Sequence, residues 1–184
     1  MTKRLLCILL AAVLAFCLFS CGKAQGADKA FAGAMDKIKA FDLDGFASYI
    51  AESSADYFDF AVAGGKSLSL SGKEALEALY FGISYEVTGE ADGFLNVKIN
   101  SFDFEKIARY VENSFALGTG AGRAEILLSL VRGESFASVY GSSAEFRLKY
   151  ENTADGVKFF FDSAENHGFV TALGLSEMIK LMAK

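Results

Sequence analysis

ISYEVTGEADGFLNVKI, residues 83–99, is the stretch of sequence that decides the fold we expect. Apolar and polar side chains alternate on both sides of a central turn, and an alternation of period two indicates a strand with one buried face. The residues expected on the buried face are Ile83, Tyr85 and Val87 on the first strand and Leu95, Val97 and Ile99 on the second. Between them, residues 89–93 (GEADG) supply turn chemistry, so the stretch predicts an antiparallel hairpin.

The same pattern returns in residues 145–161, around the turn Ala154-Asp155-Gly156. The apolar positions that share one face are Phe146, Leu148 and Tyr150 before the turn and Val157, Phe159 and Phe161 after it. A second antiparallel hairpin is therefore predicted.

Helical periodicity precedes the first hairpin. From Asp28 onward, one apolar stripe at three- and four-residue spacing is made of Phe31, Met35, Ile38 and Phe41. Asp42 or Asp44 is expected to cap a second short helix, and Gly64-Gly65 to mark a turn. Ser71-Gly72-Lys73-Glu74 has the spacing of a capping box and predicts the start of another helix.

Helices are also predicted after each hairpin. Asp103 is the expected cap of a helix whose buried side carries Phe104, Ile107, Val111 and Phe115. Gly118 to Gly122 end this helix, and residues 123–140 then form a buried helix or, alternatively, a strand. A last helix follows residue 161 and is interrupted or kinked at Gly174. The fold class is therefore α+β, with N-terminal helices packed on a curved antiparallel sheet built from two hairpins.

The N-terminus has the order of a secretory signal. Lys3 and Arg4 make it basic, residues 5–19 are an unbroken apolar run, and Ser20 precedes Cys21. A membrane-spanning helix needs about 20 apolar residues, more than this run supplies. Leu18-Phe19-Ser20-Cys21 resembles the lipobox of bacterial lipoproteins. The resemblance implies that cleavage leaves Cys21 as the new N-terminus, acylated with fatty chains such as palmitate. A secreted form and a signal-anchored form are the alternatives.

This interpretation divides the chain into three parts. Residues 1–20 are the signal peptide, residues 21–27 are the lipidated cysteine and a short tether, and residues 28–184 are a single α+β domain. The protein is then extracytoplasmic and held by lipid on the bacterial cell membrane, or on the outer membrane if the organism has one.

Composition narrows the function classes. Cys7 and Cys17 lie inside the signal, so the processed chain keeps only Cys21, and disulfides, thiol catalysis and cysteine-bound metals are not expected. Without Lys3 and Arg4, 16 of the 18 basic residues remain against 23 acidic ones. An acidic chain without a basic stripe argues against nucleic-acid binding, and gives no electrostatic attraction to an anionic membrane.

The order of elements resembles the cone-shaped α+β fold of the nuclear-transport-factor-2-like superfamily, and in particular small bacterial lipoproteins of unknown function that carry it. The matching segments are Phe41-Asp42-Leu43-Asp44-Gly45, Val97-Lys98-Ile99-Asn100 before Asp103, and Gly156-Val157-Lys158-Phe159. Those lipoproteins often have a Trp near the position of Val157, and this chain has no Trp. A cystatin-like sheet wrapped on one helix is the alternative.

Few residues suggest catalysis. His167 is the only histidine and is interpreted as a cap or a surface residue, and no Gly-x-Ser-x-Gly nucleophile elbow occurs. Residues 118–123 (GTGAGR) lack the ending of a phosphate-binding loop, and the pairs Asp42–Asp44 and Asp56–Asp59 do not have calcium-loop spacing. We expect no metal, no cofactor and no enzymatic activity.

The function predicted from the sequence is a non-enzymatic binding or protein-interaction module whose partner is an envelope protein. The first alternative is a carrier of a small apolar ligand, held in an aromatic cone lined by Tyr85, Tyr150, Phe159 and Phe161. The second is an isomerase or dehydratase of the kind found on the resembling fold, which requires a buried Asp or Glu with a raised pKa.

Overall fold

The computed structural model describes residues 26–118, 120–160 and 164–183, without the side chains of residues 55–60 and 164–167. The predicted signal peptide and Cys21 lie outside the described residues, as does Phe161. Within the described residues, no helix has the length and apolar character needed to cross a membrane.

The fold is α+β, as the sequence predicts: helices come first and a four-stranded antiparallel sheet follows. The N-terminal elements are α2 (Ala27–Lys39), α3 (Leu43–Ala47), the 3-10 turn η1 (Glu52–Ser54), α4 (Ala55–Ser67) and α5 (Leu70–Phe81). They are followed by β1 (Ser84–Ala91), β2 (Phe94–Phe102), α6 (Phe104–Ala116), α7 (Arg123–Val131), α8 (Phe136–Tyr140), β3 (Gly141–Thr153), β4 (Gly156–Phe159), α9 (Ala164–Leu173) and α10 (Leu175–Met182).

Both predicted hairpins are confirmed. The strand order is β1-β2-β3-β4, and every neighbouring pair is antiparallel. In the first hairpin Tyr85 pairs with Ile99, and in the second Tyr150 pairs with Phe159. Helices α6, α7 and α8 are inserted between β2 and β3, so the two hairpins join through a long connection.

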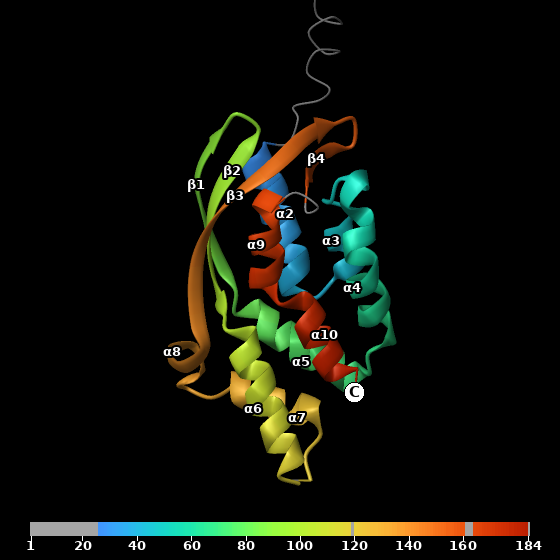
Figure 1. Ribbon diagram of the computed structural model, residues 1–184, viewed down its shortest axis with the longest axis vertical. Coiled ribbons are helices and arrows are strands. Elements are labelled where there is room, and N and C mark those ends of the chain that lie inside the picture. Colours follow the sequence, from blue (N-terminus) through green and yellow to red (C-terminus); the bar gives the residue numbers. More distant parts are fainter. Residues whose placement is uncertain (1–25, 119, 161–163, 184) are drawn as a thin grey trace, which may run out of the picture.

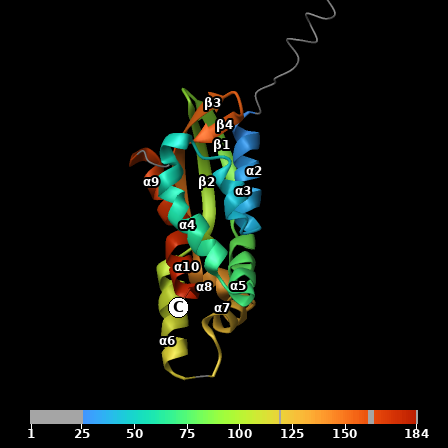
Figure 2. The ribbon, with the colours of Figure 1, turned by 90° about the vertical axis from the view of Figure 1, so that its right-hand side faces the viewer.

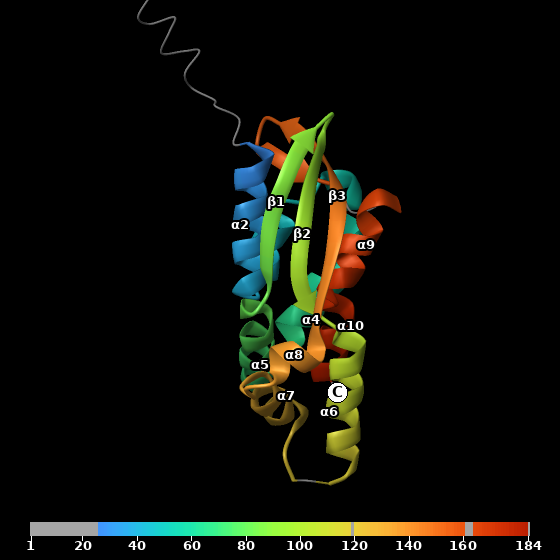
Figure 3. The same ribbon diagram turned by 90° about the vertical axis from the view of Figure 1, so that its left-hand side faces the viewer.

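Helices cover one face of the sheet and leave the other open (Figure 3). The alternation seen in the sequence places the buried side chains on the covered face: Leu95, Val97, Ile99, Leu148, Val157 and Phe159. Helices α2 and α9 lie across this face (Figures 1 and 2). The intervening strand positions, such as Glu86 and Lys149, are exposed, which explains the polar half of the alternation.

The two edge strands of the sheet, β1 and β4, differ. At β4 the chain segment around Ile50 forms a parallel bridge with Phe159, and Ala51 donates its backbone N–H to the Phe159 carbonyl at 2.9 Å. At β1 the ladder with β2 shifts register between Val87 and Gly89. A bulge of this kind makes an edge strand a poorer template for pairing with another chain.

The molecule is elongated, with a different composition of elements at its two ends (Figure 1). One end contains the tips of both hairpins and the start of α2. The opposite end contains α6, α7 and the connection between them. Between these ends, the buried Tyr80 of α5 donates its hydroxyl hydrogen to the Leu173 carbonyl at the end of α9, at 2.8 Å.

Several predicted local signals are confirmed. The carboxylates of Asp42 and Asp103 accept backbone N–H groups at the starts of α3 and α6, and Gly174 separates α9 from α10 with φ of 57°. Residues 123–140 form two helices rather than a strand. In α6 the side chains of Phe104, Ile107 and Val111 are buried as expected, but Phe115 was misassigned to the buried side.

Two expectations were wrong. Gly64-Gly65 is not a turn but lies inside α4, because the helix packs closely there: a Cβ on Gly64 would lie 2.7 Å from Ile179 and one on Gly65 2.7 Å from Leu43. Ser71 does not cap α5. The cap is Ser69, whose hydroxyl accepts the backbone N–H of Gly72 at 3.1 Å, so the helix starts earlier than the capping-box spacing suggested.

Candidate binding cleft

The aromatic residues predicted to line a cone are placed together, but against a ring from α2. Phe31 lies edge-on to Tyr85 with 5.2 Å between ring centroids and to Phe159 with 5.8 Å, and Tyr150 is 6.3 Å from Phe159. Phe31 and Phe159 are fully buried. The fourth predicted residue, Phe161, lies outside the described residues.

The two tyrosines of this group sit at its margin. The Tyr150 hydroxyl donates to a carboxylate oxygen of Glu90 at 2.6 Å, and this hydrogen bond, with burial and the charge of Glu90, raises the pKa of Tyr150. Burial and the charge of Asp36 raise the pKa of Tyr85. Neither tyrosine, nor Phe159, lines the clefts described below.

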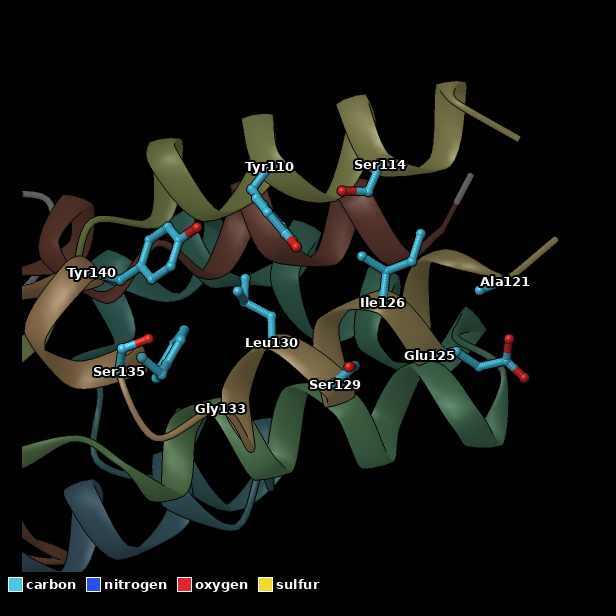
Figure 4. A pocket seen from close by; sticks show the side chains of 11 residues that line it. Tyr110, Ser114, Ala121, Glu125, Ile126, Ser129, Leu130, Gly133, Ser135 and Tyr140 are labelled. Atoms are coloured by element: carbon cyan, nitrogen blue, oxygen red, sulfur yellow. The ribbon is translucent and has the colours of Figure 1, made fainter. Parts of the chain in front are cut away.

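A cleft of about 380 Å³ lies instead among α6, α7 and α8, at the opposite end of the molecule (Figure 4). We call it the α6–α8 cleft. It is lined by Tyr110, Ser114, Ala121, Glu125, Ile126, Ser129, Leu130, Gly133, Ser135, Phe136 and Tyr140. Its volume falls within the range of small-molecule sites, about 300–1,000 Å³.

Helical spacing explains the arrangement of the walls. In α6, Ile107 and Val111 are buried on the core side, which leaves Tyr110 and Ser114, four residues apart, on the face toward the cleft. In α7, Ile126 and Leu130 form the facing wall with the same spacing (Figure 4). The helix then stops before Gly133, and the short α8 closes one end of the cleft with Phe136 and Tyr140.

Tyr140 brings a hydroxyl to this cleft. The residue as a whole is 7% exposed, and within the described part of the chain no hydrogen-bond partner of its hydroxyl is found. Its ring lies 6.4 Å from that of Tyr110, and burial, with a smaller contribution from Tyr110, raises the pKa of Tyr140. Figure 4 shows both hydroxyls on the cleft side of their rings. A hydroxyl that faces the cleft without a protein partner provides a point at which a ligand can bind.

Two cations near the cleft, Lys106 and Arg123, are already engaged. Lys106 donates its Nζ hydrogen to the Val139 carbonyl at 2.9 Å while lying 5.3 Å from the centre of the Tyr140 ring. Arg123 pairs with Glu112 at 3.1 Å and covers the ring of Phe115. Among the described residues that line the cleft, only Glu125 is charged, and one of its oxygens accepts the backbone N–H of Gly122 at 3.0 Å.

A second cleft, of about 600 Å³, lies where the sheet meets α6, α9 and α10. Asp103, Glu105 and Glu177 make it acidic, and the buried Ser101 also lines it. Burial, followed by the charges of Glu105 and Asp103, raises the pKa of Glu177, while Arg109 and Lys180 oppose this shift. Asp103 is engaged as the cap of α6, and Glu105 lies 3.6 Å from Arg109.

The other chemical features named from the sequence are placed as follows. His167 lies within α9, but its side chain is outside the described residues. The glycine-rich segment 118–122 connects α6 to α7, with Thr119 outside the described residues. The part of the chain that the structure describes contains no group of three His, Cys, Asp or Glu side chains arranged to hold a metal ion.

The sequence interpretation missed the residues of the α6–α8 cleft. The signal that marks them is the pair of hydroxyl residues Tyr110 and Ser114, each of which comes three residues after a buried residue of α6, Ile107 or Val111. No protein-family model, curated protein or solved structure was found to match this chain.

Proposed function

We propose that this protein is a non-enzymatic, lipid-anchored binding module outside the bacterial cytoplasm, and that the α6–α8 cleft is its binding site. The observation that carries the proposal is the position of the cleft at the opposite end of the molecule from the start of α2 (Figure 1). A chain anchored through Cys21 would therefore present its cleft away from the lipid.

Chain geometry supports this orientation. Strand β3 runs from the α8 end of the molecule to the hairpin tips, and its 13 residues span about 40 Å at the usual rise of a strand. The residues between Cys21 and α2 reach at most about 20 Å. When the long axis of the domain is perpendicular to the membrane, the tether is therefore too short to bring the α6–α8 cleft to the lipid surface.

Charge supports lipid as the means of attachment. The chain has an excess of acidic residues, so an anionic membrane surface repels it. A single acyl chain binds membranes only marginally, whereas two or more chains hold a protein stably. A diacylglyceryl group on Cys21 would supply that attachment.

The nuclear-transport-factor-2-like assignment is part of the same proposal. It is supported by the element order, with helices before a hairpin and further helices before a second hairpin, and by a sheet that bends around helices on one face (Figure 1). The cystatin-like alternative has a single helix against the sheet, and here both α2 and α9 occupy that face.

Fractionation of cells that express the full chain tests the anchor. We expect the protein in the membrane fraction, and we expect Cys21→Ser, or an inhibitor of lipoprotein signal peptidase, to leave uncleaved precursor. Ser20→Ala is the matched control, because it keeps a small residue before the cysteine. Release of processed Cys21→Ser protein to the medium would contradict the lipoprotein proposal.

Distance to the lipid tests the orientation. If Cys21 is acylated, an introduced cysteine is the sole free thiol of the processed chain. A dye on Ser129→Cys, in the cleft, is compared with a dye on Ala91→Cys, at the tip of the first hairpin. In phosphatidylcholine vesicles with a headgroup quencher, strong quenching is expected only at residue 91. Equal quenching at both positions would contradict the proposed orientation.

A further inference from the structure

We infer that the α6–α8 cleft recognises a short neutral carbohydrate, one or two sugar rings, through its hydroxyl groups and aromatic rings. The inference rests on the proposed function, since it names the ligand class of the same site. Three properties of the cleft lead to it: its charge, its hydrogen-bonding groups and its apolar wall.

The charge of the cleft disfavours anionic ligands. Glu125 is the only charged residue among the described ones that line it. Lys106 and Arg123, two cations described above, are held by the Val139 carbonyl and by Glu112. A phosphate or carboxylate ligand would lose hydration and gain no counter-charge from the described residues that line the cleft, which costs free energy. A neutral ligand avoids that cost.

The polar groups of the cleft suit partners that both donate and accept. Tyrosine and serine hydroxyls can do either, whereas a carboxylate only accepts. The hydroxyls come from Tyr110, Ser114, Ser129, Ser135 and Tyr140. Sugar hydroxyls have the same dual character, and they can reach Tyr140, whose hydroxyl faces the cleft and has no partner among the described residues.

The remaining surface of the cleft is apolar and partly aromatic. The rings of Phe136 and Tyr140 lie 5.3 Å apart with an angle of 30° between their planes, and Ile126 and Leu130 continue the wall opposite Tyr110. A sugar ring carries C–H groups on its face and hydroxyls at its edge, so its face can pack on aromatic rings while the edge is hydrogen-bonded. An acyl chain would leave the five hydroxyl groups unpaired, which is unfavourable.

The volume of the cleft limits the length of the sugar that it can hold. A volume of about 380 Å³ can accommodate one or two sugar rings. The same chemistry is offered by a free disaccharide and by the end of a glycan polymer in the cell envelope. Both sources are therefore tested, the disaccharide as a soluble sugar and the glycan as an immobilised polymer.

Ligand-observed NMR on the purified full-length protein tests the inference. The protein is kept in a zwitterionic detergent, because a detergent with a sugar headgroup would compete. The probes are maltose and N,N′-diacetylchitobiose, with glucose 6-phosphate as the anionic comparison and decanoate as the apolar one. Retention on amylose and on chitin resin then distinguishes a polymer end from a free sugar.

Variants that remove one hydroxyl locate the binding site. We expect Tyr140→Phe and Tyr110→Phe each to weaken binding of the preferred disaccharide about three- to tenfold, the effect of one lost neutral hydrogen bond. Tyr85→Phe is the matched control, since it removes a half-buried tyrosine hydroxyl at the other end of the molecule. It should bind as wild type does. Circular dichroism melting verifies that each variant is folded.

Saturable binding of a neutral sugar that the two cleft variants weaken and Tyr85→Phe does not would support the inference. Three results would overturn it: no saturable signal from either disaccharide, tighter binding of glucose 6-phosphate or decanoate, or equal losses in Tyr85→Phe and the cleft variants. If fractionation and quenching give the expected results while the sugars fail, only the ligand class is wrong. If the protein is not anchored, the proposed function fails whatever the sugars do.

Discussion

The aromatic clusters at the two ends of the molecule differ in how completely they are packed. Around Phe31, three rings lie within 6 Å, at centroid distances of 5.2 Å to Tyr85, 5.8 Å to Phe159 and 5.9 Å to Phe169. Around Tyr140, Phe136 is equally close, but Tyr110 stands 6.4 Å away across a cleft.

The difference follows from what each cluster packs against. Phe31 projects from α2 onto the covered face of the sheet, where α9 contributes Phe169 from the other side. The Tyr140 cluster is enclosed by α6, α7 and α8, of which the last has five residues. A short helix offers little surface, so the same residue types fill a core at one end and line a cleft at the other.

The largest expected effect is the removal of the Phe31 ring. Phe31→Ala should lower the free energy of unfolding by about 3–5 kcal/mol, the usual cost of deleting a buried phenylalanine. Phe115→Ala, at a position 40% exposed at the cleft end of the molecule, should lower it by less than about 1 kcal/mol. Urea denaturation of both variants measures the contrast. Equal losses would contradict the contrast between the buried Phe31 and the exposed Phe115.

A smaller effect is expected from added volume. Ala34 is buried on α2 beside the Phe31 cluster, and Ala34→Leu should cost about 1–3 kcal/mol through overpacking. Ser129→Leu adds an apolar side chain in the α6–α8 cleft, where space exists, and should change stability by at most about 0.5 kcal/mol. Denaturation midpoints provide the measurement. A costly Ser129→Leu would indicate that the cleft is not open.

The smallest effect concerns the second cleft, between the two ends. Its Glu177 has a pKa raised by burial and by Glu105 and Asp103, with Arg109 and Lys180 opposing. A glutamate that binds its proton more tightly in the folded state destabilises that state once the proton is lost. Stability therefore falls as pH rises through the folded-state pKa, and this contribution is absent well below the ordinary value of 4.5.

Glu177→Gln removes that titration. The melting temperature of Glu177→Gln minus that of the parent protein should rise slightly as pH increases from 4 to 7. Glu74→Gln on α5 is the exposed control. Only the direction is predicted, because solvent screens a partly exposed carboxylate. A melting-temperature difference that stays constant over this range would contradict the assigned role of Glu177.

The sequence predicted the parts of the fold that depend on local periodicity. Alternation around Tyr85 and around Tyr150 located both hairpins, and the side chains of Asp42 and Asp103 located helix starts, since strand faces and caps are set by neighbours in the chain. The turn predicted at Gly64-Gly65 was wrong because these glycines serve tertiary packing: they permit close approach of Ile179 and Leu43.

The α6–α8 cleft was not predictable in the same way. Tyr110, Ile126 and Tyr140 lie on three helices, and each helix alone shows only an amphipathic pattern. Whether the space between them is filled depends on the angles at which the helices meet and on the length of the connection before α8. Strand aromatics such as Tyr85 were the more conspicuous candidates, but their neighbour Phe31 comes from a distant helix.

The contacts of Phe31 also determine when this chain can fold. Its partners Phe159 and Phe169 come from β4 and α9, near the other end of the sequence, and β4 is held in turn by the segment around Ile50. Contacts between such distant segments slow folding, because a long loop must close first. Phe31 therefore cannot complete its contacts until nearly the whole chain, through α9, has been synthesised, whereas α3 and α5, which also contact α2, are available much earlier.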